Sequence, residues 1–270
     1  MRAIPDDNLA YPILITLSNG STGSGFYLNA KEYLCLISAK HVLFDENNNL
    51  LAPSAKLLSY SKDHNKKEPI VYELNLEILL KNNEIVLHPD KDVVAIRLSK
   101  ARNGNIEAGT YSDLVTGVKA IPTATKSGII GAGIETIKKI DEVLIANEVF
   151  VFGYPVSLGI NSSPQFDYFR PLLRRGIIAG IYNEKGTIIL DCPVYPGNSG
   201  GPVVERELID ISRYNTNIIG VVSEFIPYVE TWQNLKHGYC NSEISNSGYS
   251  VVTAMDSVFE ILEFFKGRNT

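Results

Sequence analysis

Residues 194–204 are Val194-Tyr195-Pro196-Gly197-Asn198-Ser199-Gly200-Gly201-Pro202-Val203-Val204. This segment sets one serine among three glycines and ends in a β-branched pair that is typical of a strand start. Glycines let the backbone adopt positive φ and let a substrate approach closely. The amides of Gly197 and Ser199 are then able to point at one developing oxyanion. The segment is interpreted as a nucleophile turn, which requires a base and an orienting carboxylate elsewhere in the chain.

A histidine and an aspartate upstream meet that requirement. His41 follows one apolar run, and Asp92 directly precedes another. A partly buried carboxylate fixes the tautomer of an imidazole and stabilises the imidazolium that forms when a serine loses its proton. Asp90 would face the same side of an extended strand, but only Asp92 abuts the apolar run. We therefore predict His41 as the base, Asp92 as the orienting carboxylate and Ser199 as the nucleophile.

Four sequence blocks in this order resemble serine proteases of the trypsin and chymotrypsin fold, in particular the protease domains of bacterial Deg/Htr-type proteases. The blocks are Gly23-Ser24-Gly25-Phe26-Tyr27, Ser38-Ala39-Lys40-His41, Asp92-Val93-Val94-Ala95-Ile96 and Gly197-Asn198-Ser199-Gly200-Gly201-Pro202. The resemblance implies a serine endopeptidase that works through an acyl-enzyme intermediate, with Gly197 and Ser199 as the oxyanion hole. It also implies a protein or peptide substrate, selective cleavage of a protein partner, and room for a regulatory protein partner.

Short apolar runs between Gly, Asn and Pro breakers predict an all-β fold, either barrels or a sandwich. The resemblance selects two six-stranded antiparallel β-barrels with a C-terminal α-helix. We expect residues 1–120 to form the first barrel, residues 121–255 the second and residues 256–270 the helix. An apolar face and a capping-box pair, Ser257 and Glu260, support this helix, which the resemblance places on the second barrel. Ile70–Leu80 is read among the strand runs, and Ile226–Ser247 is predicted as a pocket-side loop.

The resemblance also points to residues that contact substrate. The position six residues before the serine, where the family has its pocket floor, is Pro193, so we expect a small or medium uncharged residue before the cleaved bond. An edge strand formed by Val222, Ser223 and Glu224 is expected to hold the substrate backbone, and Phe225 is expected to narrow the pocket. Asn198 stands where digestive relatives have Asp, and an amide cannot form the ion pair that follows activation by N-terminal cleavage.

Composition limits the kinds of binding partner and the cellular compartment that we expect for this protein. A formal net charge of −5 argues against a nucleic-acid surface, and no segment suggests membrane insertion or export. Three cysteines, Cys35, Cys192 and Cys240, cannot all pair within one chain, although a single Cys192–Cys240 bond is left open. We therefore expect a reducing, cytoplasmic setting, and a bacterial origin by resemblance. No Cys-x-x-Cys or His-x-x-x-His spacing occurs, so neither a metal nor a cofactor is expected.

Two other functions compete with the protease. Gly197–Gly201 fits the Gly-x-Ser-x-Gly nucleophile elbow of an α/β-hydrolase esterase, which places a helix directly after the serine and an acid and a histidine later in the chain. Pro202 and the valines after it predict a strand there instead. The second alternative is an inactive protease-like scaffold that binds a partner. Such scaffolds usually lack a triad residue, whereas all three positions are filled here.

Overall fold

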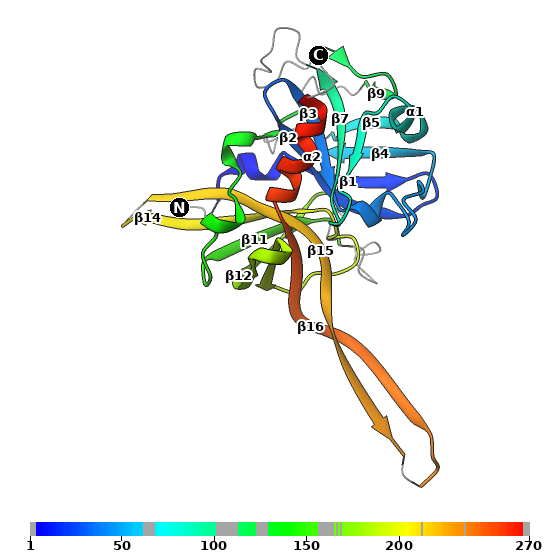
Figure 1. The fold of residues 1–270 in the computed structure, drawn as a ribbon, viewed down its shortest axis with the longest axis vertical. Helices are drawn as coiled ribbons and strands as arrows, with labels where there is room; N and C mark the ends of the chain where they lie inside the picture. Colours follow the sequence, from blue (N-terminus) through cyan, green and yellow to red (C-terminus); the bar gives the residue numbers. More distant parts are fainter. Residues whose placement is uncertain are drawn as a thin grey trace.

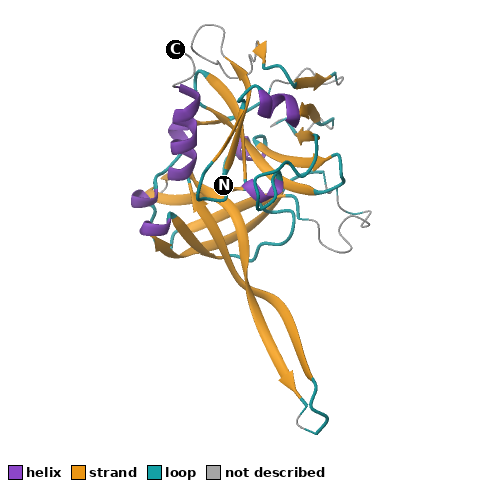
Figure 2. Ribbon diagram, turned by 45° about the vertical axis from the view of Figure 1, so that its right-hand side comes forward, coloured by secondary structure: helices purple, strands orange, loops and turns teal. Residues whose placement is uncertain are grey.

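The computed structural model describes residues 4–61, 68–100, 113–122, 129–155, 165, 167, 169–211, 213–234 and 236–266. Two β-sheets make up most of the described chain, and a helix runs beside them near the C-terminus (Figure 1, Figure 2). No helix among the described residues is long and apolar enough to cross a membrane.

The first sheet is an open sheet with strand order β6-β7-β3-β2-β1-β4-β5-β9, to which β10 adds beside β2 and β8 beside β7. Its strands are β1 (Pro12–Leu17), β2 (Thr22–Asn29), β3 (Tyr33–Ser38), β4 (Ser54–Ser59), β5 (Ile70–Asn75), β6 (Ile85–Leu87), β7 (Val94–Lys100), β8 (Asp113–Leu114), β9 (Val118–Ile121) and β10 (Ala132–Gly133). Neighbouring strands along the order are antiparallel. Beyond the runs expected from sequence, the sheet gains short strands such as β4 and β9.

The second sheet is a closed barrel in the order β11-β12-β13-β16-β15-β14. Its strands are β11 (Glu148–Gly153), β12 (Leu172–Tyr182), β13 (Thr187–Asp191), β14 (Pro202–Asp210), β15 (Arg213–Gln233) and β16 (Cys240–Ala254). The prediction of an all-β, trypsin-like double-barrel fold with a C-terminal helix is confirmed. The second barrel has the six strands expected, whereas the first sheet has ten strands among the described residues. The boundary expected at residue 120 stays a prediction. Strand β10 still pairs with the first sheet, and β11 opens the second.

Two α-helices and several short 3₁₀ helices complete the fold. They are α1 (Leu76–Lys81), α2 (Asp256–Lys266), η1 (Asp6–Leu9), η2 (Lys40–Val42), η3 (Ile134–Thr136), η4 (Ile140–Glu142) and η6 (Asn183–Lys185). Reading all of Ile70–Leu80 as strand was wrong after Asn75. The Asn75 side chain accepts a hydrogen bond from the Ile78 N–H at 2.9 Å, and this N-cap starts α1.

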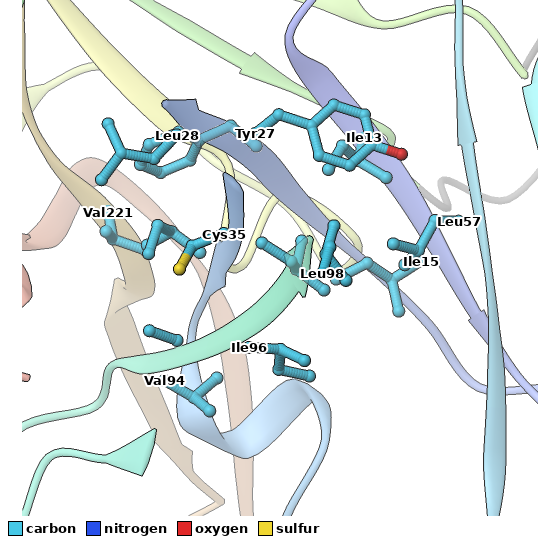
Figure 3. Packing of buried hydrophobic residues seen from close by; sticks show 14 of the residues in the cluster. Ile13, Ile15, Tyr27, Leu28, Cys35, Leu57, Val94, Ile96, Leu98 and Val221 are labelled. Carbon is cyan, nitrogen blue, oxygen red and sulfur yellow. The ribbon is translucent and has the colours of Figure 1, made fainter. Parts of the chain in front are cut away.

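The main core lies inside the first sheet and extends to the second (Figure 3). Ile13 and Ile15 on β1 meet Leu57 on β4, and all three side chains are fully buried. Burying each such side chain contributes about 1.5–3 kcal/mol. Val221 on β15 belongs to the same cluster. The two sheets therefore share one apolar core at the place where they meet.

Helix α2 packs on the first sheet, which corrects the expectation that it packs on the second barrel. Its buried residues Val258, Ile261, Leu262 and Phe265 belong to the core cluster of the first sheet. The Tyr33 hydroxyl donates a hydrogen bond to the Leu262 carbonyl at 3.1 Å, and the Arg97 guanidinium lies 5.1 Å from the centre of the Phe265 ring. Glu260 does not serve a capping box here. Its carboxylate bonds the buried His88 imidazole at 2.8 Å, so α2 ties down the segment that leads to Asp92.

Residues 226–247 form an extended two-stranded ribbon, so the prediction of a pocket-side loop was wrong. Strands β15 and β16 run on together past the barrel, and Figure 1 and Figure 2 show this ribbon projecting away from both sheets. Pairing continues from Pro227↔Asn246 to Gln233↔Cys240. Alternating Val, Thr and aromatic residues favour the strands, although their polar neighbours resemble a loop in sequence.

Candidate active site

The pairing of two strands brings His41 and Asp92 together. Strand β3 ends at Ser38, which lies opposite Val94 at the start of β7. His41 sits in the 3₁₀ turn η2 just after β3, and Asp92 lies just before β7. The His41 Nδ1 atom lies 2.8 Å from Asp92 Oδ2, and the His41 N–H donates to Asp92 Oδ1 at 3.0 Å. The same carboxylate thus fixes both the ring and the backbone of the histidine.

This contact changes the pKa of both groups. The hydrogen bond to Asp92 raises the pKa of His41 above its usual 6.5, and desolvation opposes this rise only in part. The negative charge of Glu224 raises it further. Burial acts to raise the pKa of Asp92, but the hydrogen bonds and charge of His41 outweigh it and lower that pKa. Asp92 therefore stays ionised while the imidazole titrates, as an orienting carboxylate must.

Ser199 lies in a turn that only glycine permits at several positions. Gly197 has φ +95° and Gly200 has φ +86°, which disfavours side chains of L residues. A Cβ at Gly200 would overlap the Ser24 carbonyl oxygen and the Ser38 hydroxyl. A Cβ at Gly201 would overlap the carbonyl oxygen of Phe152 on β11. Gly200 is thus required by close packing against the first sheet, and Gly201 by close packing within the second.

A buried serine of the first sheet holds this turn in place. The Ser24 N–H donates to the Ser199 carbonyl at 2.9 Å, and the Ser24 hydroxyl donates to the Gly197 carbonyl at 2.6 Å. The same hydroxyl accepts the Tyr154 N–H at 3.0 Å. Ser38 braces the arrangement by donating to the Ser24 carbonyl at 2.7 Å. No role for Ser24 was predicted from the sequence, although this residue lies in the first of the four motif blocks.

The amides predicted for the oxyanion hole are available. Gly197 is buried, and its carbonyl is turned toward Ser24. Within the described residues, neither the Gly197 N–H nor the Ser199 N–H donates a hydrogen bond to another protein group. Buried N–H groups are nearly always paired in native proteins. Free amides beside a serine hydroxyl are therefore suited to receive an oxyanion.

His41, Asp92 and Ser199 line one cleft of about 570 Å³ between the two sheets. Its other lining residues are Val194, Tyr195, Pro196, Ser223, Glu224 and Phe225. The Ser199 hydroxyl donates to the Ser223 carbonyl at 3.2 Å. No bond between Ser199 and His41 is formed among the described residues. Catalytic hydrogen bonds of this kind are often loose without substrate and tighten in the complex.

The predicted substrate-binding residues fall into two groups. Ser223, Glu224 and Phe225 line the cleft. Asn198 is buried, and its side-chain oxygen accepts the Tyr195 N–H at 3.0 Å, so it shapes the turn from within. Val222, also buried, fixes the turn through backbone bonds to Gly200 and Gly201.

Pro193 is partly buried and lies outside the set of residues that line the cleft. Asp90, the rival for the carboxylate role, donates its backbone N–H to the His88 ring at 3.1 Å. The contact to His41 comes from Asp92 alone of these two aspartates.

A family model of the trypsin-like peptidase domain matches residues 23–208. The chain belongs to this family. A curated relative, the uncharacterized protein y4bJ of Sinorhizobium fredii (strain NBRC 101917 / NGR234), is 37% identical over 82 residues, which are 30% of this chain and 11% of that protein. This trypsin-like peptidase domain thus corresponds to a small part of that relative.

Comparison with solved structures finds similar chains among proteases. The HtrA-type protease AlgW with a tripeptide matches with a TM-score of 0.50 and 15% identity, covering 97% of this chain and 61% of that chain. The serine endoprotease from Yersinia pestis matches with a TM-score of 0.47 and 13% identity, covering 97% and 66%. This chain spans less than two thirds of either structure. At 15% identity the first likeness supports the fold and nothing finer.

A second hollow of about 690 Å³ lies between β1, β4, β5 and β9 of the peptidase domain. Its lining contains neither histidine nor cysteine, and Lys56 and Glu73 within it pair with each other at 3.6 Å. Among the described residues, no group of three or more His, Cys, Asp or Glu is placed to hold a metal ion. Of these two hollows, the cleft around Ser199 is the one that brings a histidine together with an aspartate and a serine.

Proposed function

We propose that the protein is a serine endopeptidase in which His41, Asp92 and Ser199 form the catalytic triad. One observation carries the proposal. An aspartate-bound histidine and a serine flanked by free backbone amides line the same cleft. These are the parts that acyl transfer by a serine requires. The family of the chain supports a serine protease, and the triad and the acyl-enzyme step are our extension of it.

The residues act in two half-reactions. His41 accepts the proton of the Ser199 hydroxyl as its oxygen attacks the scissile carbonyl, and the amides of Gly197 and Ser199 hold the oxyanion. His41 then protonates the leaving amine, which departs and leaves Ser199 acylated. Water, activated by the same imidazole, hydrolyses the ester and restores the serine. Asp92 holds His41 throughout and balances the charge on the imidazolium.

Substrate binding itself brings Ser199 toward its base. Without substrate, the Ser199 hydroxyl donates to the Ser223 carbonyl. A substrate chain that adds to the edge of β15 offers backbone N–H groups to that edge. Once a substrate N–H occupies the Ser223 carbonyl, the serine hydroxyl must find another acceptor, and the His41 imidazole lies in the same cleft.

The test compares the wild-type protein with Ser199→Ala. A fluorophosphonate probe should label the wild type at Ser199, and a peptide library should reveal hydrolysis that the variant lacks. Equal melting temperatures of the two proteins would show that the loss is chemical. Hydrolysis that persists in Ser199→Ala would contradict the proposal that Ser199 is the nucleophile. A wild type that neither reacts nor cleaves is the result expected of the inactive scaffold.

The esterase alternative finds no support in the fold. The nucleophile elbow needs a helix directly after the serine, whereas Pro202 begins strand β14 here. This confirms the strand predicted from Pro202 and the valines that follow it.

We propose that the residue before the cleaved bond is small or medium and uncharged. Val194, Pro196 and Phe225 give the cleft an apolar lining. The Arg174 guanidinium lies 4.5 Å from the ring centre of Tyr195, one of the residues that line the cleft, so this ring already contacts a cation. Profiling of the peptide library tests this. Predominant cleavage after Lys or Arg would overturn it.

We propose that the protein is active without cleavage of its N-terminus. Asn198, the residue before Ser199, bonds the Tyr195 N–H within its own turn and as an amide forms no ion pair with a new N-terminus. Protein carrying an N-terminal extension should therefore cleave peptides normally.

We also propose a reducing compartment. Cys35 and Cys192 are buried, Cys240 is exposed, and all three are free thiols. We therefore favour a cytoplasmic setting and, given the bacterial relative, a bacterial host. Thiol titration of protein from native cells should find three thiols, and finding fewer would contradict the compartment.

A further inference from the structure

The ribbon beyond the barrel, residues 226–247, is here called the arm. Along the arm, β15 and β16 pair only with each other among the described residues. The partner on the other side of β15 ends at the pair Pro202↔Val221, and that of β16 begins at Asp191↔Tyr249. The arm therefore presents two free strand edges to solvent. Two strands alone are marginally stable in water, and a free edge readily pairs with another chain.

One face of the arm carries an unfavourable pair of charges. Glu230 lies directly opposite Glu243, and like charges in that position are destabilising. Both side chains are exposed, and neither forms an ion pair with another described residue. A cation brought by another molecule would remove this repulsion.

Aromatic side chains flank the two carboxylates. Strand residues two apart face the same side, so Tyr228 and Trp232 lie on the face of Glu230. Their side chains are 54% and 49% exposed, so both rings are accessible to another molecule. Aromatic rings attract Lys and Arg side chains over their faces. We call Tyr228, Glu230, Trp232 and Glu243 the acidic–aromatic face.

The arm is continuous with the cleft. Strand β15 passes from Ser223, Glu224 and Phe225, which line the cleft, directly into the arm. The Asn246 side chain donates to the Val194 carbonyl at 2.6 Å and joins the base of the arm to the cleft wall. A chain bound at the edge of β15 in the cleft meets the arm edge as it continues.

We propose that the arm binds the part of a polypeptide substrate that precedes the cleaved bond, as a third strand on the free edge of β15. This inference rests on the proposed function. Antiparallel pairing, the more stable arrangement, places the N-terminal flank of the substrate along the arm. A Lys or Arg in that flank lies opposite Glu230, between Tyr228 and Trp232. The substrates are thus extended polypeptides with a basic residue upstream of the cut.

The spacing of the basic residue follows from the strand. Glu230 lies seven positions after Ser223, and antiparallel partners advance together, so the basic residue lies roughly eight residues before the cleaved bond. At about 3.3 Å per residue this is a reach of about 23 Å. Pro227 has no N–H to offer to an added strand, so the contacts concentrate at the cleft and on the acidic–aromatic face.

Charge favours this occupant over a second copy of the chain. Two acidic–aromatic faces brought together would place four carboxylates in contact, and the chain as a whole carries a formal net charge of −5. A basic segment of another polypeptide is complementary to both. Self-association through the arm is therefore an outcome that would overturn the proposal.

The experiment uses three peptides built on a cleavable core found in the library. One is the short core, and the others extend it by a dozen residues that carry either Lys or Glu eight positions before the cut. We expect KM for the Lys peptide to be about tenfold lower than for the Glu peptide. Glu230→Lys with Glu243→Lys should reverse this preference, and Tyr228→Ala with Trp232→Ala should remove it. All variants should cleave the short core as the wild type does.

A matched control separates the site from net charge. Glu184→Lys changes an exposed carboxylate on η6, away from the arm, and should leave the Lys preference intact. Binding is also measured without catalysis, by fluorescence anisotropy of the labelled peptides on Ser199→Ala. Equal affinity of that protein for the Lys and Glu peptides would overturn the arm proposal whether or not the enzyme is active. Arm-dependent dimers in sedimentation that bind no peptide would also overturn it.

Failure of the proposed function has a separate signature. In that case the short core is not cleaved and the fluorophosphonate probe finds no Ser199, while the anisotropy comparison still decides the role of the arm. If the short core is cleaved and the extension has no effect, the proposed peptidase activity is supported and the proposed role of the arm is wrong.

Discussion

Replacing Ser24 with alanine tests whether the first sheet holds the nucleophile turn. The substitution removes one hydroxyl that donates to the Gly197 carbonyl at 2.6 Å and accepts the Tyr154 N–H at 3.0 Å. Both backbone groups lie in buried residues. The smaller alanine admits no protein group to replace the hydroxyl, so both are left unpaired.

The magnitude follows from those two lost bonds. A buried polar group without a partner costs about 1–3 kcal/mol, so two such groups should lower the free energy of unfolding by about 2–6 kcal/mol. A domain in the middle of the usual range of about 5–15 kcal/mol remains folded after such a loss. Gly197, released from its anchor, can also turn its amide out of the proposed oxyanion hole. Loss of one such donor lowers kcat by about 10²–10³-fold, and a partial loss should lower it at least about tenfold.

Urea unfolding, peptide hydrolysis and the rate of fluorophosphonate labelling measure these effects. The matched control is Ser99→Ala. The Ser99 hydroxyl is equally buried but has no hydrogen-bond partner in the described structure, so its removal should leave stability unchanged or raise it. If Ser24→Ala unfolds at the same urea concentration as Ser99→Ala and keeps its kcat within threefold of wild type, the hydrogen bonds of the Ser24 hydroxyl do not position the nucleophile turn.

Two further predictions concern the same site. Gly200→Ala places a side chain at a positive φ, which costs about 1–2 kcal/mol, and brings its Cβ into the Ser24 carbonyl oxygen. The melting temperature should therefore fall, and fluorophosphonate labelling of Ser199 should stop. An active variant with the melting temperature of the wild type would contradict this. Because Asp92 and Glu224 raise the pKa of His41 and the neutral imidazole is the proposed base, the acid limb of kcat/KM should lie above pH 6.5 and move down in Glu224→Gln. An unmoved limb in that variant would exclude the contribution of Glu224. By linkage, the stability that His41 gains is present below about pH 6.5 and is lost as pH rises through its folded pKa.

The sequence was informative where local rules and burial agree. Strands β1, Pro12–Leu17, and β13, Thr187–Asp191, are apolar runs between turn residues, which is the pattern from which the all-β fold was predicted. The proximity of His41 and Asp92 was also predictable, because residues at the end of one strand and the start of its antiparallel partner are neighbours. The catalytic roles of these residues stay predictions until they are tested.

The rest depends on tertiary contacts that a local pattern does not contain. The periodicity of α2 shows an apolar face but not the sheet that covers it, and that sheet was the first one. The role of Ser24 arises from a hydrogen bond across 173 positions. The arm was missed because exposed strands lack the apolar alternation that burial imposes, and its Ser, Asn and Glu residues favour a loop by composition alone.

Glu224 and Glu230 lie on one strand, but they are too far apart for a charge bound at one to affect the surroundings of the other. Six residues of strand between them span about 20 Å, whereas charges in physiological salt are screened over about 8 Å. Glu224 is close enough to raise the pKa of His41, but a lysine bound opposite Glu230 is not close enough to lower it. A substrate with the upstream lysine should therefore differ from its glutamate counterpart in KM, while both show the same acid limb of kcat. A limb that moved with the lysine would mean that the basic residue reaches the cleft, because only there would its charge compete with that of Glu224.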